Sequence, residues 1–317
     1  MTKTSPVPRF LLALALLLPA VAMAEVPASA ANATSGYSKK GADTCLSCHD
    51  EEAVDGIFKT KHGQPGNPRA PFGAGQLQCE ACHGPGGNHT KKLKKGEKRP
   101  PNIRFGRDSE TPVPAQNTMC LNCHRQNIGA MWEAGPHAGN DVPCAGCHTI
   151  HKPKDAVRVR ATQPDVCYTC HADKRGQFMK PYAHPVREGK LACSDCHTPH
   201  GTTADAQLKR PTINETCYEC HADKRGPYLW EHAPVTENCA NCHNPHGSIN
   251  PSMLKTRGPL LCQSCHSMQG HQSFSYGPSG LPGGGGPPVT ALALGNCTNC
   301  HSQVHGSNHP SGSSLTR

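Results

Sequence analysis

The sequence predicts a fold of coil and short α-helices with almost no β-strand, built around an interior that side chains do not fill. Hydrophobic residues make up 35% of the 317 residues and aromatic residues only 4%, and 20 of the hydrophobic residues are Cys. The 32 Gly and 30 Pro disfavour long helices and strands. Such a chain buries too little apolar surface to offset the entropy of ordering it, unless another group supplies the core.

The cysteines indicate what that group is, because all 20 fall in C-x-x-C-H motifs. Two thiols at this spacing can bond to the vinyl groups of one porphyrin, and the adjoining imidazole then lies beneath the iron as its proximal ligand. Structural zinc sites would need two ligand pairs for each metal, and C-x-x-C is a redox motif more often than a structural disulfide. The motifs therefore predict ten covalent haem c groups, stacked as the core of a multihaem cytochrome c.

The predicted haem-binding residues are the two Cys of each motif: Cys45, Cys48, Cys79, Cys82, Cys120, Cys123, Cys144, Cys147, Cys167, Cys170, Cys193, Cys196, Cys217, Cys220, Cys239, Cys242, Cys262, Cys265, Cys297 and Cys300. The predicted proximal iron ligands are the His that end the motifs: His49, His83, His124, His148, His171, His197, His221, His243, His266 and His301. No residue is predicted to be catalytic.

Eleven further His lie outside the motifs, close to one for each iron, and a lone His follows every motif. Ten are predicted to be the second axial ligands: His62, His89, His137, His151, His184, His200, His232, His246, His271 and His305. A lone His three residues after a motif His cannot reach the opposite face of the same haem, so it must serve a different one. Either His305 or His309 is spare. Gly306 follows His305 as Gly201 follows His200, which favours His309 as the spare.

An internal repeat supports an array of dihaem units, because CYTCHADKRG at 167–176 recurs as CYECHADKRG at 217–226. Trp132, Phe178 and Trp230 are interpreted as one recurring position that packs on a porphyrin face. We expect a signal peptide at 1–24, with an uncleaved anchor as the alternative, and a flexible lead-in at 25–44. Two pentahaem halves are expected at 45–180 and 181–317, with a linker or surface loop at 277–288.

The formal charge of +9 is interpreted as counter-charge for haem propionates, which argues against a nucleic-acid partner. A bis-His haem has no open coordination position, so it passes electrons rather than binding a substrate at iron. The sequence therefore predicts an electron-transfer protein and not an enzyme. It is expected to be exported to the periplasm and to have no transmembrane helix of its own.

These motifs, with CTNCHSQVHGSNHPSG near the C-terminus and the segments CHTPHG and CHNPHG, resemble the decahaem c-type cytochromes of the MtrA/MtoA/PioA (DmsE-type) family. The resemblance implies a conduit inside an outer-membrane β-barrel porin, with redox-partner cytochromes. Electrons would move between periplasm and cell exterior, in extracellular metal respiration or in Fe(II) oxidation. The alternatives are a periplasmic multihaem reductase of small nitrogen or sulfur oxyanions with one open haem, and a diffusing periplasmic electron shuttle.

Overall fold

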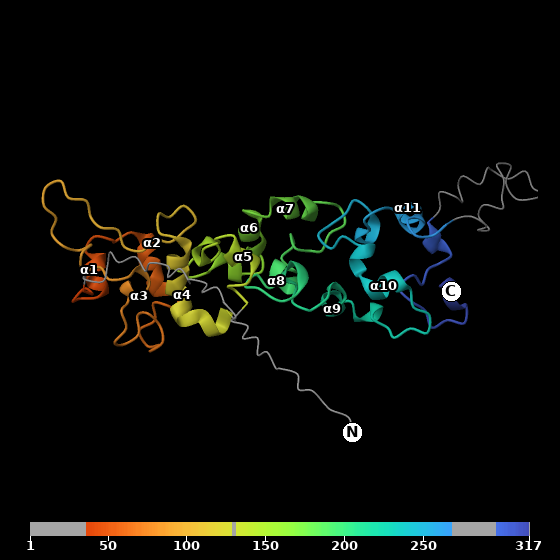
Figure 1. Ribbon diagram of the computed structural model, residues 1–317, viewed down its shortest axis with the longest axis horizontal. Helices are drawn as coiled ribbons and strands as arrows, with labels where there is room; N and C mark the ends of the chain where they lie inside the picture. The colour runs from red at the N-terminus through yellow and green to blue at the C-terminus, as the bar shows by residue number, and fades with distance from the viewer. Residues whose placement is uncertain (1–35, 129–130, 268–295, 317) are drawn as a thin grey trace, which may run out of the picture.

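The computed structural model describes residues 36–128, 131–267 and 296–316. The predicted signal peptide, the segment 277–288 and His271 lie outside these ranges. The chain is elongated, with α1 and α3 near one end and α10 and α11 near the other (Figure 1). The order of the elements along the long axis therefore follows their order in the sequence.

Short helices joined by coil make up the described chain, as predicted. The α-helices are α1 (Ala42–Leu46), α2 (Glu52–Asp55), α3 (Glu80–His83), α4 (Val113–Ile128), α5 (Pro136–Gly139), α6 (Gln163–Tyr168), α7 (Ala172–Phe178), α8 (Cys193–Cys196), α9 (Ile213–Tyr218), α10 (Ala233–Glu237) and α11 (Gly258–Gln263). The 3-10 helices are η1 (Gly56–Lys59), η2 (Cys144–Gly146), η3 (Ala156–Arg158), η4 (Asp205–Gln207), η5 (Ala222–Lys224), η6 (Cys239–Asn241), η7 (Pro251–Met253), η9 (Cys297–Asn299) and η10 (Gly312–Ser314).

Paired strands are absent from the described residues, where β-structure is limited to isolated bridges. The bridges repeat: His197 pairs with Leu208 as His243 pairs with Leu254, and Tyr182 pairs with Ser248 as Trp230 pairs with Ser307. Each bridge fastens a loop that carries a His, so the repeat seen in the sequence is also a repeat in space.

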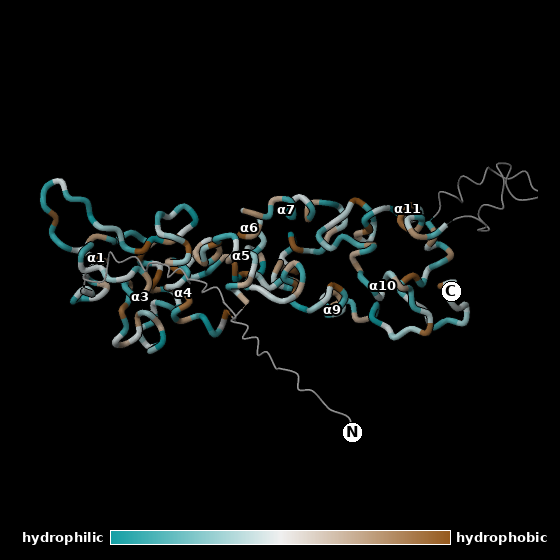
Figure 2. The backbone as a smooth tube through the Cα atoms, viewed as in Figure 1, coloured by the Kyte–Doolittle hydropathy of each residue, from teal (hydrophilic) through white to brown (hydrophobic). Residues whose placement is uncertain are grey.

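Few apolar side chains are buried, as the composition predicts. In the described ranges the buried hydrophobic residues are Ala42, Ile57, Ala70, Trp132, Phe178, Val186, Ala192 and Leu315. Apolar segments are short and dispersed along the chain instead of gathering into one layer (Figure 2). Side chains alone therefore do not form a conventional core.

The end of the predicted lead-in contacts the rest of the chain. Ser38 donates from its backbone N–H and its hydroxyl to the carboxylate of Glu80, at 3.0 and 2.8 Å. Gly86 N–H also donates to this carboxylate, at 2.7 Å, and Glu80 is 4% exposed. The end of the lead-in is thus tied to the second motif through a buried acid.

Candidate haem-binding sites

Each C-x-x-C-H motif closes a single helical turn. Outside α4, whose own helix contains the third motif, the backbone N–H of each motif His donates to the carbonyl of the first Cys at 2.9–3.1 Å. The odd-numbered motifs begin in the α-helices α1, α4, α6, α9 and α11, and the even-numbered ones in the shorter turns α3, η2, α8, η6 and η9. One turn is the geometry that directs two thiols and an imidazole toward one ligand.

Among the described residues, nine motif His face nine lone His, ring to ring. The centroid distances run from 5.9 to 6.3 Å, in the pairs His49–His89, His62–His124, His83–His151, His137–His171, His148–His200, His184–His221, His197–His246, His232–His266 and His243–His305. Two imidazoles that each bind one metal through a nitrogen at about 2.0–2.1 Å have centroids about 6.3 Å apart, because the nitrogen lies about 1.1 Å from the centroid. The spacing fits one iron between the two rings of each pair.

The pairs follow a rule that sequence spacing does not reveal. The odd-numbered motifs, from the third on, pair backward: each motif His faces the lone His that follows the motif two places earlier, as His124 of the third motif faces His62 after the first. The even-numbered motifs, up to the eighth, pair forward: each motif His faces the lone His that follows the motif two places later. His49 of the first motif is the exception and faces His89 after the second. His151 thus faces His83 and not the nearby His148.

The Nδ1 atoms of many of these imidazoles are held by backbone carbonyl groups. His83 Nδ1 lies 2.8 Å from Ile103 O, and His197 Nδ1 lies 2.8 Å from Ala206 O. Lone His are held in the same way, as His184 Nδ1 lies 2.7 Å from Pro245 O. A carbonyl accepts only from a protonated Nδ1, so Nε2 of the neutral ring is left unprotonated and free to bind a metal. This is the tautomer that metal ligation requires.

Burial keeps several of these rings neutral. It lowers the pKa of His246 to about 4, with further lowering from Lys174 and the facing His197. Burial likewise lowers the pKa of His62, His83, His200 and His305. Neutral imidazole is the form that binds a metal.

The thiols come together in two alternating patterns. The first Cys of each odd motif interacts with the first Cys of the next motif, in the pairs Cys45–Cys79, Cys120–Cys144, Cys167–Cys193, Cys217–Cys239 and Cys262–Cys297. The second Cys of each even motif interacts with the second Cys of the following motif, in the pairs Cys82–Cys123, Cys147–Cys170, Cys196–Cys220 and Cys242–Cys265. Every motif is therefore joined to the next, in chain order.

A large cavity runs along the described chain, and its lining includes Cys of the first to the seventh motif. Its volume is about 3920 Å³, and its lining extends from Thr44 to His246, whereas ordinary ligand pockets measure about 300–1,000 Å³. The Tyr168 hydroxyl and the Gln207 side-chain nitrogen line this cavity and are buried without a hydrogen-bond partner. A row of porphyrins with carboxylate substituents fits both the volume and the unpaired polar atoms.

The described residues contain no cluster of three or more His, Cys, Asp or Glu side chains arranged to hold a metal ion. A structural zinc site would need four such ligands. An iron between two imidazoles would need its remaining ligands from a macrocycle, which is what a porphyrin provides.

His309 stands apart from the pairs. Its Nδ1 accepts a hydrogen bond from Ser311 N–H at 3.2 Å, while His305 faces His243 at 6.2 Å. His301 Nδ1 lies 2.6 Å from Ser314 O. His271 lies outside the described residues, so its role stays a prediction.

From the sequence, three aromatic residues are interpreted as one recurring position, but only two of them occupy equivalent places. Trp132 and Phe178 are buried and lie edge-on to the lone His200 and His246, at 6.0 and 5.5 Å. Trp230 instead is 42% exposed and pairs through its backbone with Ser307. Its bridge makes it the counterpart of Tyr182.

Two buried asparagines join neighbouring motifs, and sequence reasoning missed both. Asn117 Oδ1 accepts from Cys144 N–H at 2.8 Å, and Asn214 Oδ1 accepts from Cys239 N–H at 2.7 Å. Each lies three residues before the first Cys of an odd motif and binds the first Cys of the next. The recurrence of Asn three residues before the first Cys of two motifs is the sequence feature that could have indicated this role.

A carboxylate was also missed. Asp155 Oδ2 lies 2.7 Å from His148 Nδ1, where the other even-numbered motif His have a backbone carbonyl. It follows the motif closely, but sequence gives no sign that an acid replaces a carbonyl there.

Two family models match parts of the chain. Residues 184–226 and 232–271 match the doubled CXXCH motif, and residues 79–163 match the NrfB-like cytochrome c-type proteins. The described residues include no helix with the length and hydropathy needed to cross a membrane.

Three relatives are similar over longer stretches. The chain is 49% identical over 288 residues to the multihaem cytochrome MtrA of Shewanella baltica, covering 90% of this chain and 84% of that protein. It is 26% identical over 149 residues to the cytochrome c-type protein NrfB of Haemophilus influenzae, covering 41% of this chain and 65% of the relative. The high-molecular-weight cytochrome c of Nitratidesulfovibrio vulgaris is 27% identical over 189 residues, or 51% of this chain and 34% of that one. By its extent, its identity and its paired motifs, this chain belongs to the MtrA family of multihaem c-type cytochromes.

Proposed function

We propose that the chain binds ten haem c groups, each held by the two Cys of one motif and ligated by the motif His and one lone His. The nine imidazole pairs among the described residues support this assignment. For the tenth haem, the proposed ligands are His301 and His271. His309 is the spare imidazole.

The haems are proposed to form one row in the order of their motifs. The observation that carries this proposal is the alternation of neighbouring thiols: first Cys interacts with first Cys, and second Cys interacts electrostatically with second Cys, along the described chain. A thiol is the attachment point of a porphyrin edge, so neighbouring thiols bring neighbouring macrocycle edges together. The cavity, which is lined by Cys of the first seven motifs, supports the same order in that part of the row.

The proposed function is electron conduction along this row. Haem c, when bound, supplies a reversible one-electron couple. The protein fixes each iron between two imidazoles, holds the imidazole tautomers through Nδ1, and spaces the macrocycles. With both axial positions occupied by protein, there is no place for a substrate at iron, and the protein acts as a conductor rather than an enzyme.

We place the conduit in the outer membrane, between periplasm and cell exterior, with a β-barrel porin around it and cytochromes as redox partners. Similarity to MtrA over most of both chains supports this placement. The elongated shape, with motif order following the long axis, suits transfer from one end to the other (Figure 1).

The first test is spectroscopic. The purified protein should contain ten haems per chain, all low-spin, and after reduction it should bind no carbon monoxide. One equivalent of bound carbon monoxide per chain would identify an open iron and favour the reductase alternative.

The second test separates the conduit from the shuttle. Cells that express a tagged chain are fractionated, and the outer-membrane fraction is examined for a barrel protein that co-purifies with the tag. The conduit predicts co-purification and haem in the membrane fraction. Recovery of all the haem protein in the soluble periplasm, with no barrel protein, would refute the porin assignment.

A further inference from the structure

Asp155 makes one of the proposed proximal ligands different from its counterparts. In the other even-numbered motifs, the Nδ1 atoms of His83, His197, His243 and His301 lie 2.6–2.8 Å from backbone carbonyl oxygens. His148 Nδ1 lies 2.7 Å from a carboxylate oxygen instead. The Asp155 side chain is 15% exposed, so solvent screens this contact far less than a surface pair.

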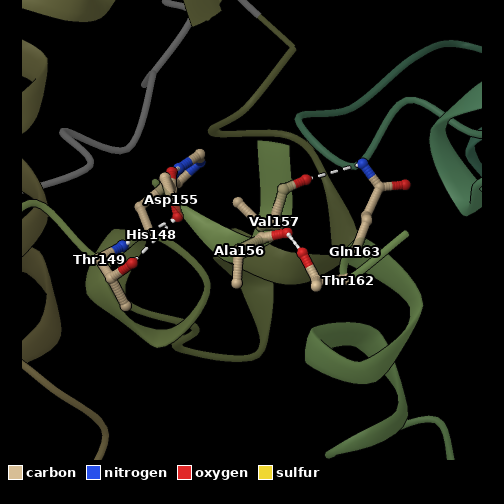
Figure 3. Close-up of polar contacts among 7 residues, drawn as sticks. All are labelled: His148, Thr149, Asp155, Ala156, Val157, Thr162 and Gln163. Atoms are coloured by element: carbon tan, nitrogen blue, oxygen red, sulfur yellow. Dashed lines mark hydrogen bonds and ion pairs between the residues drawn. The ribbon is translucent and has the colours of Figure 1, made fainter. Parts of the chain in front are cut away.

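The carboxylate is fixed in place from several sides (Figure 3). Asp155 Oδ1 accepts from the N–H and the hydroxyl of Thr149, at 3.1 and 3.3 Å. The following turn, η3, is held by Thr162 Oγ1 on Ala156 O and by Gln163 Nε2 on Val157 O, both at 2.8 Å. The described ion pairs give Asp155 no Lys or Arg partner, so no cationic side chain pairs with its charge beside the imidazole.

A second motif His of the described chain also has a carboxylate near its Nδ1, but that carboxylate is farther away and more exposed. His49 Nδ1 has a carboxylate nearby, at Glu51 Oε2, but the separation is 4.0 Å and the Glu51 side chain is 62% exposed. That distance exceeds a hydrogen bond, and water screens the charge. Asp155 is thus the acid in the described chain that bonds a motif imidazole directly.

We propose that Asp155 is a positioning residue that lowers the reduction potential of the haem at Cys144–His148 relative to its neighbours. The inference rests on the proposed function. A carboxylate acceptor pulls the Nδ1 proton more strongly than a carbonyl does and makes the imidazole a stronger donor to iron. Its negative charge also favours the ferric haem, which carries one more positive charge than the ferrous form. Both effects stabilise the oxidised state.

The consequence is a change in reduction potential from one haem to the next along the row. An electron that reaches this haem comes from a neighbouring ferrous haem, which becomes ferric, and no bond or proton has to move. Because the haem at the fourth motif holds its electron less firmly, it is reduced after its neighbours and passes its electron onward readily. Asp155 thereby sets an uphill step inside the N-terminal part of the row.

The test is a spectropotentiometric titration of the full-length holoprotein with Asp155→Asn. The substitution keeps the side-chain shape and removes the charge. We expect the reduction equilibrium of one haem to become about tenfold more favourable, or about 59 mV for a one-electron couple, with the other haems unchanged. The electron paramagnetic resonance signal of one low-spin haem should shift with it.

Two further variants make the result specific. Glu51→Gln removes a carboxylate near a motif His without breaking a hydrogen bond, so its titration should match the wild type. Thr149→Val removes one donor from Asp155 and leaves the acid in place, so the same haem should shift in the opposite direction. This variant tests the inference even if Asp155→Asn lowers the haem content.

The experiments distinguish a failure of the Asp155 proposal from a failure of the proposed function. Wild-type protein with fewer than ten haems, or with a high-spin haem, would contradict the proposed function. Ten low-spin haems together with an unshifted Asp155→Asn titration, or a Glu51→Gln shift of equal size, would refute the role of Asp155 alone.

Discussion

The pairing of His151 with His83 makes a prediction that goes beyond local spacing, which excluded the haem of His148 but did not say which iron His151 serves. Replacing His151 by Ala should open the iron of the second motif and leave the iron of the fourth motif, three residues away, fully ligated. The ring centroids of His151 and His83 are 6.2 Å apart, and each of the other imidazoles in the described pairs already faces a partner ring. A five-coordinate ferrous haem binds carbon monoxide.

The expected effect of His151→Ala on spin state, carbon monoxide binding and stability follows from the contacts that His151 makes. One haem per chain should become high-spin, and the reduced protein should bind one equivalent of carbon monoxide. The variant also loses a bond from His151 Nδ1 to Ala53 O at 3.2 Å, which contributes about 1 kcal/mol net. The rest of the fold is expected to persist, since both Cys still hold the haem.

Double variants identify which iron has opened. His83→Ala removes the other ligand of the same proposed iron, so the His83→Ala/His151→Ala variant should still bind carbon monoxide at a single haem. The His148→Ala/His151→Ala variant should bind it at two. His309→Ala is the control and should bind none.

The opposite stoichiometries would refute the reasoning. If His148→Ala/His151→Ala opens one haem while His83→Ala/His151→Ala opens two, then His151 serves the haem of its own motif and the ring pairs are not ligand pairs. Carbon monoxide titration followed by absorbance gives the count directly.

Four other substitutions test how the polypeptide holds the motifs in place. Asn214→Ala leaves the partly buried backbone N–H of Cys239 without its acceptor and should lower the stability by about 1 kcal/mol, seen as a lower thermal midpoint. Gly247→Ala places a Cβ 2.2 Å from Gln177 O at a φ of +137° and should reduce the yield of holoprotein. Gly176→Ala, with open space at its Cβ, should be neutral or stabilising by up to about 1 kcal/mol. Glu80→Ala should expose the segment around residues 36–44 to limited proteolysis, and an unchanged cleavage pattern would argue against that tether.

Much of the fold was predictable because composition restricts it. Low apolar content and abundant Gly and Pro predicted short helices in coil, and the family match agrees with the multihaem class. The division into two pentahaem halves stays a prediction. The Cys167 thiol, before that boundary, interacts with Cys193 beyond it.

Sequence could not supply the polar partners of the motifs. Asn117 lies 27 residues from Cys144 and Asp155 only 7 from His148. Both are common polar residues, and only the fold brings one to the backbone of Cys144 and the other to the ring of His148. The recurrence of Asn three residues before Cys120 and Cys217 was visible, but its meaning depended on the partner. A hydrogen bond between distant segments leaves no periodic signal.

The sequence by itself determined the chemistry that one helical turn can hold: two thiols, one imidazole, and by their number the proposed count of haems. It determined these because the C-x-x-C-H spacing is a local property of the backbone. Only the tertiary structure decided which lone His faces which motif His, in what order the motifs meet, and which imidazole receives a carboxylate. Those choices depend on loops that cross between motifs, as when His83 meets His151, and loop paths are set by packing around the whole row.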